Sequence, residues 1–171
     1  APMRMIDLLR HTSGLTYEIL GNDPIQLQYA KARLGARDMP NRTFAQTLAR
    51  IPYRFEPGTV WEYSRATDLL GALVEVVSGQ TLGAFLHDNI ISPLGMVDTG
   101  FAVPPEHHHR IAEPFEKDPD GAIPMRLLDP RKPPAMEAGG AGLVSTAADY
   151  ALFSQALLDG GTLGNARLLS P

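Results

Sequence analysis

Residues 55–79 constrain the fold of this chain more than any other stretch. They join a Pro57-Gly58 turn to an aromatic segment and then to an apolar repeat. Proline fixes φ and glycine accepts positive φ, so the turn is well marked. The repeat predicts a helix with one buried face, which we expect to end at a left-handed Gly79. The residues of that face are Leu69, Leu70, Leu73, Val74 and Val77.

The aromatic segment supplies the candidate for chemistry. Residues 60–63 alternate in the manner of a short extended piece. A turn then delivers Tyr63 and Ser64 into the helix, where a side chain can be held rigidly and still face a cleft. We therefore select Tyr63 as the candidate reactive group. The alternative is that Trp61 and Tyr63 are ordinary core aromatics.

Composition limits the remaining possibilities. The 171 residues are 44% hydrophobic, which suits one globular domain spanning residues 1–171. The net charge of −4 and the scattered cationic residues exclude a basic surface for nucleic acid. With no cysteine, disulfides and thiolate chemistry are excluded. The sequence has neither an apolar run of membrane-spanning length nor a signal-peptide pattern at Ala1, so we expect a soluble segment. Its compartment can be periplasmic, extracellular or cytoplasmic.

The other predicted elements are also mostly helical. A short helix at residues 3–9 precedes Gly14, a possible helix covers 25–34, and a Thr43-to-Gln46 capping box opens a helix that Pro52 stops. Residues 17–40 as a whole are interpreted either as a mobile flap or as a surface excursion. Thr81 caps a helix that buries Leu82, Phe85, Leu86 and Ile90. Residues 92–96 end this helix, because proline disfavours helical geometry in the residue before it and glycine permits the reversal. Thr146 caps the last helix, which turns Tyr150, Phe153, Leu157 and Leu158 inward and ends at Gly160-Gly161. Residues 111–115 and 122–125 flank a turn at 118–121, which indicates a hairpin whose prolines would confine the strands to a sheet edge.

Three other segments can be interpreted as sites, and each has a simpler explanation. His11 and Ser13 resemble a base and a nucleophile, but a turn held by hydroxyl-to-backbone bonds fits the single glycine better. The adjacent imidazoles of residues 107–109 point in different directions, so we expect a solvated loop and no metal site. The glycines of residues 139–142 lack the lysine of a phosphate loop, which favours close backbone packing.

Several strings together resemble the penicillin-recognising serine hydrolases: serine β-lactamases of the AmpC kind, D-Ala-D-Ala carboxypeptidases and their esterase relatives. The resemblance covers most of the chain, and five strings occur in register. They are Leu8-Leu9-Arg10-His11-Thr12-Ser13-Gly14-Leu15, Phe55-Glu56-Pro57-Gly58 leading to Tyr63-Ser64, Val76-Val77-Ser78-Gly79, residues 93–101, and residues 139–149.

The resemblance implies a fold of which this chain contains only one part. The family uses a serine nucleophile in Ser-x-x-Lys, a tyrosine in a Tyr-x-Asn-like element, and a C-terminal Lys/His/Trp-x-Gly strand. Only the tyrosine element occurs here, because no serine is followed three residues later by lysine. We therefore expect an internal fragment: a mainly α chain with short β pieces, the helical part of an α+β fold whose central antiparallel sheet is largely missing. Apolar faces left uncovered predict either self-association or retained contact with the missing segments.

The resemblance also implies a chemistry. The parent would be a serine hydrolase that forms an acyl-enzyme from a small ester or amide, without cofactor or metal, and the isolated fragment would be inactive. Tyr63 would carry the proton, and Trp61, Ser64 and Arg65 would contact substrate. Arg65 replaces the family's Asn and, having no acceptor, favours the esterase-like branch. The alternative is a catalytically inactive helical binding module on the same scaffold.

Overall fold

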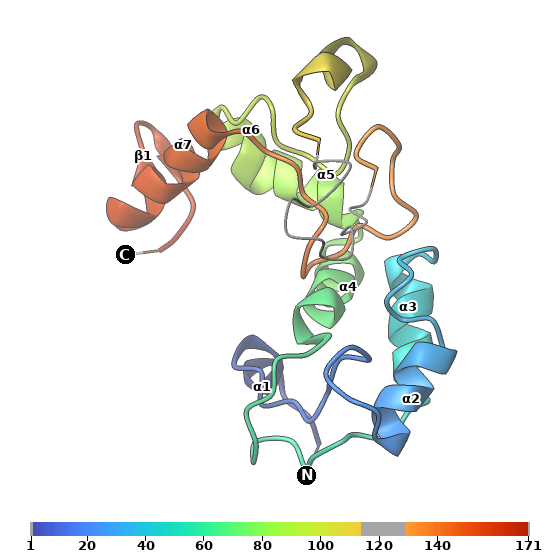
Figure 1. Cartoon of the computed structure of the whole chain (residues 1–171). Helices are drawn as coiled ribbons and strands as arrows, with labels where there is room; N and C mark the ends of the chain where they lie inside the picture. Colours follow the sequence, from blue (N-terminus) through green and yellow to red (C-terminus); the bar gives the residue numbers. More distant parts are fainter. Residues whose placement is uncertain (1, 114–128, 171) are drawn as a thin grey trace, which may run out of the picture. The chain divides into compact units, whose positions relative to one another are not determined.

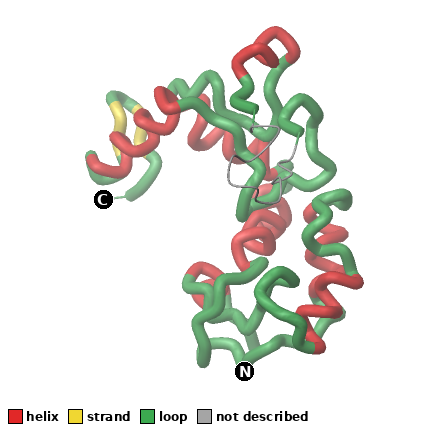
Figure 2. The backbone as a smooth tube through the Cα atoms, in the orientation of Figure 1, coloured by secondary structure: helices red, strands yellow, loops and turns green. Residues whose placement is uncertain are grey.

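The computed structural model describes residues 2–113 and 129–170 (Figure 1). Helices and loops dominate this part of the chain, and strands are confined to one short hairpin (Figure 2). The chain divides into two compact units, residues 1–90 with 135–142 and residues 91–134 with 143–171. Most of the hairpin predicted at residues 111–125 lies outside the described residues.

The first unit is built from five α-helices around one apolar core. Its helices are α1 (Met5–Leu9), α2 (Pro24–Lys31), α3 (Asn41–Leu48), α4 (Ala66–Ser78) and α5 (Leu82–Leu86). Helix α4 contacts α1, α3 and α5. The most deeply buried side chains of the core are Tyr29, Leu34, Phe44 and Met136. Tyr29 and Leu34 belong to the segment interpreted as a flap or a surface excursion, so this segment contributes to the core instead.

Helix α4 has the predicted ends but not the predicted buried face. Gly79 ends it in the left-handed conformation with φ of 72°. Its buried residues are Ala66, Asp68, Gly71 and Ala72. Of the predicted face, Leu69, Leu70, Leu73 and Val74 are only partly buried, and Val77 is 82% exposed. Small residues occupy most of the buried face of α4, because another backbone segment approaches this face too closely for a leucine side chain.

That approaching segment is the glycine-rich stretch that follows Met136. A Cβ added at Gly139 would lie 2.3 Å from the carbonyl oxygen of Thr67, so only glycine fits there. The N–H of Gly140 donates to Oδ1 of Asp68 at 3.0 Å. The contact confirms that these glycines allow close backbone packing.

The segments before α4 differ from prediction in their local geometry. Helix α1 ends at Leu9, and it is His11, with φ of 54°, that first takes the left-handed conformation, ahead of Gly14. Ser13 is buried, and its hydroxyl has no hydrogen-bond partner among the described residues, so the predicted hydroxyl-to-backbone bond is wrong there. Helix α3 begins at Asn41, which places Thr43 inside the helix, where it cannot act as an N-cap.

The predicted stop at residues 92–96 is confirmed at Gly95, whereas Pro93 does not end the helical run. Thr81 caps α5 as predicted, by accepting a hydrogen bond from the N–H of Ala84. A π-helical turn, η1 (His87–Ile91), follows α5, and α6 (Ser92–Leu94) continues the helical run to a left-handed Gly95. Proline has no N–H, so a change of helical register before it avoids the bond that proline cannot donate.

The second unit carries the remaining elements. They are the 3₁₀ helix η2 (Pro105–Arg110), α7 (Ala147–Leu158), and the antiparallel strands β1 (Thr162–Leu163) and β2 (Ala166–Arg167). The residues 107–109 predicted as a solvated loop form part of η2. Thr146 caps α7 as predicted, by accepting from the N–H of Asp149. The β1–β2 hairpin was not predicted from the sequence.

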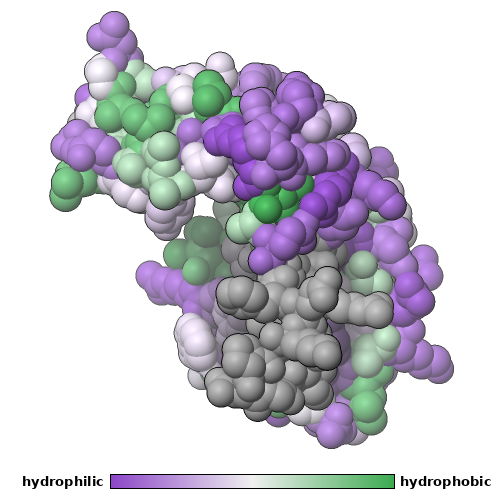
Figure 3. All heavy atoms as spheres, turned by 45° about the horizontal axis from the view of Figure 1, so that its top comes forward, coloured by the Kyte–Doolittle hydropathy of each residue, from purple (hydrophilic) through white to green (hydrophobic). Residues whose placement is uncertain are grey.

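Helix α7 turns out more of its apolar side chains than predicted. Tyr150, Leu157 and Leu158 are exposed, whereas Asp149 and Ala156 are buried. Figure 3 shows hydrophobic side chains on the surface in the region of this helix. Within the described part of the chain no single helix is long and apolar enough to cross a membrane; only the bent pair of residues 66–78 and 82–94 passes on length and composition together.

Candidate active site

Backbone hydrogen bonds hold the segment before α4 against the loop after α1. The N–H of Glu62 donates to the carbonyl of His11 at 2.9 Å, and the N–H of Arg65 donates to the carbonyl of Thr16 at 3.2 Å. Residues 60–63 belong to no helix or strand. Tyr63 lies between these two bonds, and its side chain is 49% exposed. The phenol is thus carried on a fixed backbone and remains open to solvent.

The Tyr63 ring belongs to a group of four rings, which we call the aromatic cluster: His11, Tyr17, Trp61 and Tyr63. The Tyr63 ring centroid lies 5.1 Å from that of His11 and 5.1 Å from that of Tyr17. His11 also meets Trp61 edge to face at 6.2 Å. Trp61 is 67% exposed, so it is a surface aromatic rather than a core one. The cluster offers an apolar surface beside the Tyr63 hydroxyl.

Ser64 and Arg65 point into the protein. The Ser64 side chain is fully buried, with Oγ 3.3 Å from Nδ1 of His11. Arg65 is also buried and forms ion pairs with Glu18 and Asp68. The family resemblance implies substrate contact for both side chains, whereas their burial leaves no surface for that contact. Of the four residues selected from the sequence, Trp61 and Tyr63 are the two that face outward.

The carboxylates around Arg65 raise the pKa of both Arg65 and its neighbour Tyr17. Burial disfavours the guanidinium charge, but hydrogen bonds and charges from Glu18 and Asp68 raise the pKa of Arg65 above its usual value. Its guanidinium also lies 4.5 Å from the centre of the Tyr17 ring. Burial, followed by the Asp68 charge, raises the pKa of Tyr17 to about 12. Tyr17 therefore stays a neutral phenol beside the exposed Tyr63.

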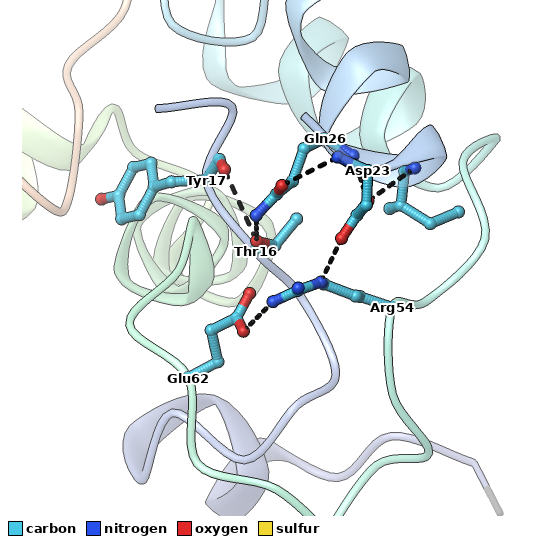
Figure 4. A network of polar contacts seen from close by, with 7 residues as sticks. Thr16, Tyr17, Asp23, Gln26, Arg54 and Glu62 are labelled. Carbon is cyan, nitrogen blue, oxygen red and sulfur yellow. Dashed lines mark hydrogen bonds and ion pairs between the residues drawn. The ribbon is translucent and has the colours of Figure 1, made fainter. Parts of the chain in front are cut away.

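A polar network connects α2 to the segment that carries Tyr63 (Figure 4). Arg54 pairs with Asp23, the N-cap of α2, and with Glu62. Gln26 donates to the Thr16 hydroxyl at 3.2 Å. The start of α2 is therefore linked by ion pairs to Glu62, the residue before Tyr63.

The first unit also contains an apolar groove of about 460 Å³, away from the aromatic cluster. Its lining includes Met3, Leu48, Ile51, Tyr53 and Leu69, and none of the four cluster residues. No group of three metal-ligating side chains occurs among the described residues.

The contacts of His11 and Tyr17 with Tyr63 could not be predicted from the sequence. Residue patterns pair His11 only with Ser13 and assign no function to Tyr17. Both residues belong to the loop after α1, and His11 falls within one of the five strings that carried the family resemblance. That string was the available signal, but its contact with Tyr63 depends on tertiary structure.

Several known proteins are similar to this chain in sequence. Protein Rv1367c of Mycobacterium tuberculosis is 35% identical over 167 residues, which cover 96% of this chain and 41% of that protein. Esterase EstB of Burkholderia gladioli is 38% identical over 80% of this chain and 34% of its own length. A putative D-alanyl-D-alanine carboxypeptidase of Escherichia coli O157:H7 is 31% identical over 98% of this chain and 41% of its own length.

Solved structures agree with these relatives. EstCE1, described as a hydrolase with promiscuous acyltransferase activity, superposes with a TM-score of 0.74 at 25% identity, over 97% of this chain and 48% of that one. Unliganded simvastatin synthase (LovD) from Aspergillus terreus gives 0.66 at 29% identity, over 92% of this chain and 38% of that one. The chain thus spans less than half the length of these relatives. Because the Beta-lactamase family model matches residues 1–170, the chain belongs to the Beta-lactamase family, that of the penicillin-recognising serine hydrolases.

Proposed function

We propose that this chain is part of a serine hydrolase that transfers an acyl group from a small ester to water, with Tyr63 as the proton carrier. The observation that carries the proposal is a half-exposed phenol on a backbone fixed at both sides. Relatives named as esterases, acyltransferases and a carboxypeptidase support the reaction class.

In the proposed reaction Tyr63 moves one proton twice. A serine hydroxyl is a weak nucleophile near neutral pH, so a base must take its proton as the oxygen attacks the ester carbonyl. The Tyr63 phenolate takes that proton, and a lysine beside it would favour the phenolate because an opposite charge lowers the pKa of an acid. When the carbon–oxygen bond of the ester breaks, Tyr63 returns the proton to the leaving alcohol. Water then releases the acyl group from the serine.

The serine and the lysine of this reaction come from outside the 171 residues. No serine in the chain is followed three residues later by lysine. The relatives are more than twice as long as the matched segment, which leaves room for both groups elsewhere in the whole protein. The isolated chain is therefore inactive in this proposal.

The surroundings of Tyr63 favour an ester over a β-lactam substrate. Arg65 stands at the position of the family's Asn, and its guanidinium is occupied by Glu18 and Asp68. A guanidinium has donors only and is buried here, so it does not replace an amide that binds the substrate. Trp61 is exposed beside Tyr63 and offers an apolar surface for the acyl group or the alcohol. Ser64 and Arg65 thus hold the Tyr63 segment in place.

Replacement of Tyr63 by phenylalanine in the full-length protein tests the proposal. Loss of a positioned proton carrier typically lowers the rate by about 10²–10⁴-fold, so kcat for p-nitrophenyl butyrate should fall by that amount. Circular dichroism and Tm should stay unchanged, because Phe keeps the ring. The matched control is Tyr150→Phe, which removes the hydroxyl of an exposed tyrosine on α7.

The substrate class is tested on the same proteins. We expect hydrolysis of p-nitrophenyl butyrate to exceed that of the β-lactam nitrocefin in kcat/KM. Normal ester turnover by Tyr63→Phe would refute the role of Tyr63. A full-length protein that hydrolyses neither compound would support the inactive binding module instead.

A further inference from the structure

His11 has a backbone conformation that its side chain makes unfavourable. Its φ of 54° lies in the left-handed region, where a Cβ crowds the backbone. Among the described residues, Arg33 and Arg37 are the other non-glycine residues with positive φ, and both lie in the loop after α2. His11 differs from them because its ring is part of the aromatic cluster. Strain of this kind is found where the surrounding structure imposes it, often at functional sites.

Hydrogen bonds on both sides impose the conformation of His11. Its N–H donates to the carbonyl of Leu8 at 3.2 Å, and its own carbonyl accepts from the N–H of Glu62 at 2.9 Å. The next residue, Thr12, donates its N–H to the carbonyl of Asp7 at 2.8 Å and accepts from the N–H of Gly58 at 2.7 Å. The loop is thus fixed both to α1 and to the segment before α4. The direction of the His11 side chain follows from this loop.

The result is that one imidazole contacts Trp61, Tyr63 and Ser64, at and beside the candidate reactive group. Nδ1 of His11 lies 3.3 Å from the hydroxyl of Ser64, a fully buried residue. The centroid of the same ring lies 5.1 Å from that of Tyr63, with the two rings tilted by 48°. The ring also meets Trp61 in a T-shaped contact. Tyr17 supports Tyr63 through a second ring contact at 5.1 Å.

We propose that His11 is a positioning residue for Tyr63, held in a strained conformation so that its imidazole fixes the phenol through Ser64 and through ring contact. The inference rests on the proposed function of Tyr63. His11 itself touches neither the substrate nor the reacting atoms in this proposal. It acts by limiting the positions that the Tyr63 hydroxyl can occupy.

Two replacements of His11 in the full-length protein separate strain from function. His11→Gly relieves the left-handed strain and removes the imidazole, so we expect Tm to change by less than about 4 °C. We expect kcat for p-nitrophenyl butyrate to fall by about 10- to 100-fold with little change in KM, because misplacement of a reacting group by about 1 Å can cost about 10²-fold. His11→Asn tolerates positive φ and keeps a polar atom near the position of Nδ1, so it should recover part of kcat. The control is His109→Asn in η2.

A double-mutant cycle decides whether His11 acts through Tyr63. In the Tyr63→Phe background there is no hydroxyl to position, so His11→Gly should cause no further loss of kcat. An equal loss in both backgrounds would overturn the inference, as would normal kcat in His11→Gly or a loss of kcat that follows Tm. If Tyr63→Phe is inactive while His11→Gly is fully active, only this inference fails. If Tyr63→Phe is fully active, the proposed function fails and this inference with it.

Discussion

At the scale of single residues, Arg65 compensates two carboxylates that the fold has removed from water. The Asp68 side chain has no exposed surface and that of Glu18 has 15%, and both pair with the same guanidinium. Asp68 also accepts from the Gly140 N–H, so this interaction reaches the glycine-rich segment. A buried charge without its partner is costly, whereas exposed pairs contribute little.

Replacement of Arg65 by methionine should therefore destabilise the protein. We expect the free energy of unfolding to fall by about 3–5 kcal/mol, because Asp68 remains buried without a cation. Urea unfolding followed by circular dichroism measures this change. Arg33→Met is the matched control, since the side chains of Arg33 and its partner Asp38 are 69% and 48% exposed, and its cost should stay below about 1 kcal/mol. Equal losses in the two variants would contradict this account.

Residue patterns located the exposed phenol but not its neighbours. Tyr63 could be selected because a turn, an aromatic segment and a helix start follow one another in the chain, and each has a local signature. His11 and Tyr17 lie about fifty residues earlier, and their ring contacts depend on how the loop after α1 packs. The burial of Ser64 and Arg65 depends on the same packing. Local rules carry no information about contacts at that separation.

At the scale of elements, helix ends were predicted better than helix faces. Thr81, Thr146 and Gly79 occupy the predicted capping positions because a cap acts on a backbone only a few residues away. The buried face of α4 depends on which segment packs against it. That segment, residues 135–142, is distant in the sequence and approaches through glycine. Leucines spaced for a buried face are therefore only partly buried.

The contact between α4 and the glycine-rich segment gives a prediction for Gly139→Ala. The added methyl group would lie 2.3 Å from the Thr67 carbonyl oxygen, so either the segment or the helix must move. Overpacking of this kind costs about 1–3 kcal/mol. Urea unfolding should show that loss for Gly139→Ala but not for Gly100→Ala, where the nearest atom is 3.7 Å away and φ is not positive. Unchanged stability of Gly139→Ala would show that the segment yields at no cost.

Sequence patterns did not predict the π-helical turn or the two very short strands. The π-helical turn η1 lets the helical run continue through Pro93, whereas the rule for proline predicts a stop. The strands β1 and β2 have two residues each, too few for an alternating pattern to be recognised.

At the scale of the whole molecule, apolar side chains remain exposed on both units. In the first unit Met5, Leu9, Val76 and Val77 are between 60% and 82% exposed. In the second unit Leu158 is 80% exposed. Contiguous exposed apolar surface commonly marks a contact with another protein surface.

We expect the isolated 171-residue chain to self-associate through such surfaces. Sedimentation velocity at increasing concentration should show a rising average mass. Replacement of both Val76 and Val77 by threonine should weaken this association, because it makes two exposed positions polar at nearly constant volume. The control is Val97→Thr, an exposed valine outside the helices. A monomer at every concentration would contradict the expectation.

The ion pairs of Arg54 and Arg65 also limit how this scaffold can be re-engineered. Residues 17–40 supply Glu18 and Asp23, which neutralise guanidinium groups on the two segments that flank Tyr63. A designer who grafts a different loop between Tyr17 and α3 must therefore supply two carboxylates in register, or replace both arginines at the same time. The sequence of residues 17–40 is therefore limited by the charges of Arg54 and Arg65 as well as by the length of the segment.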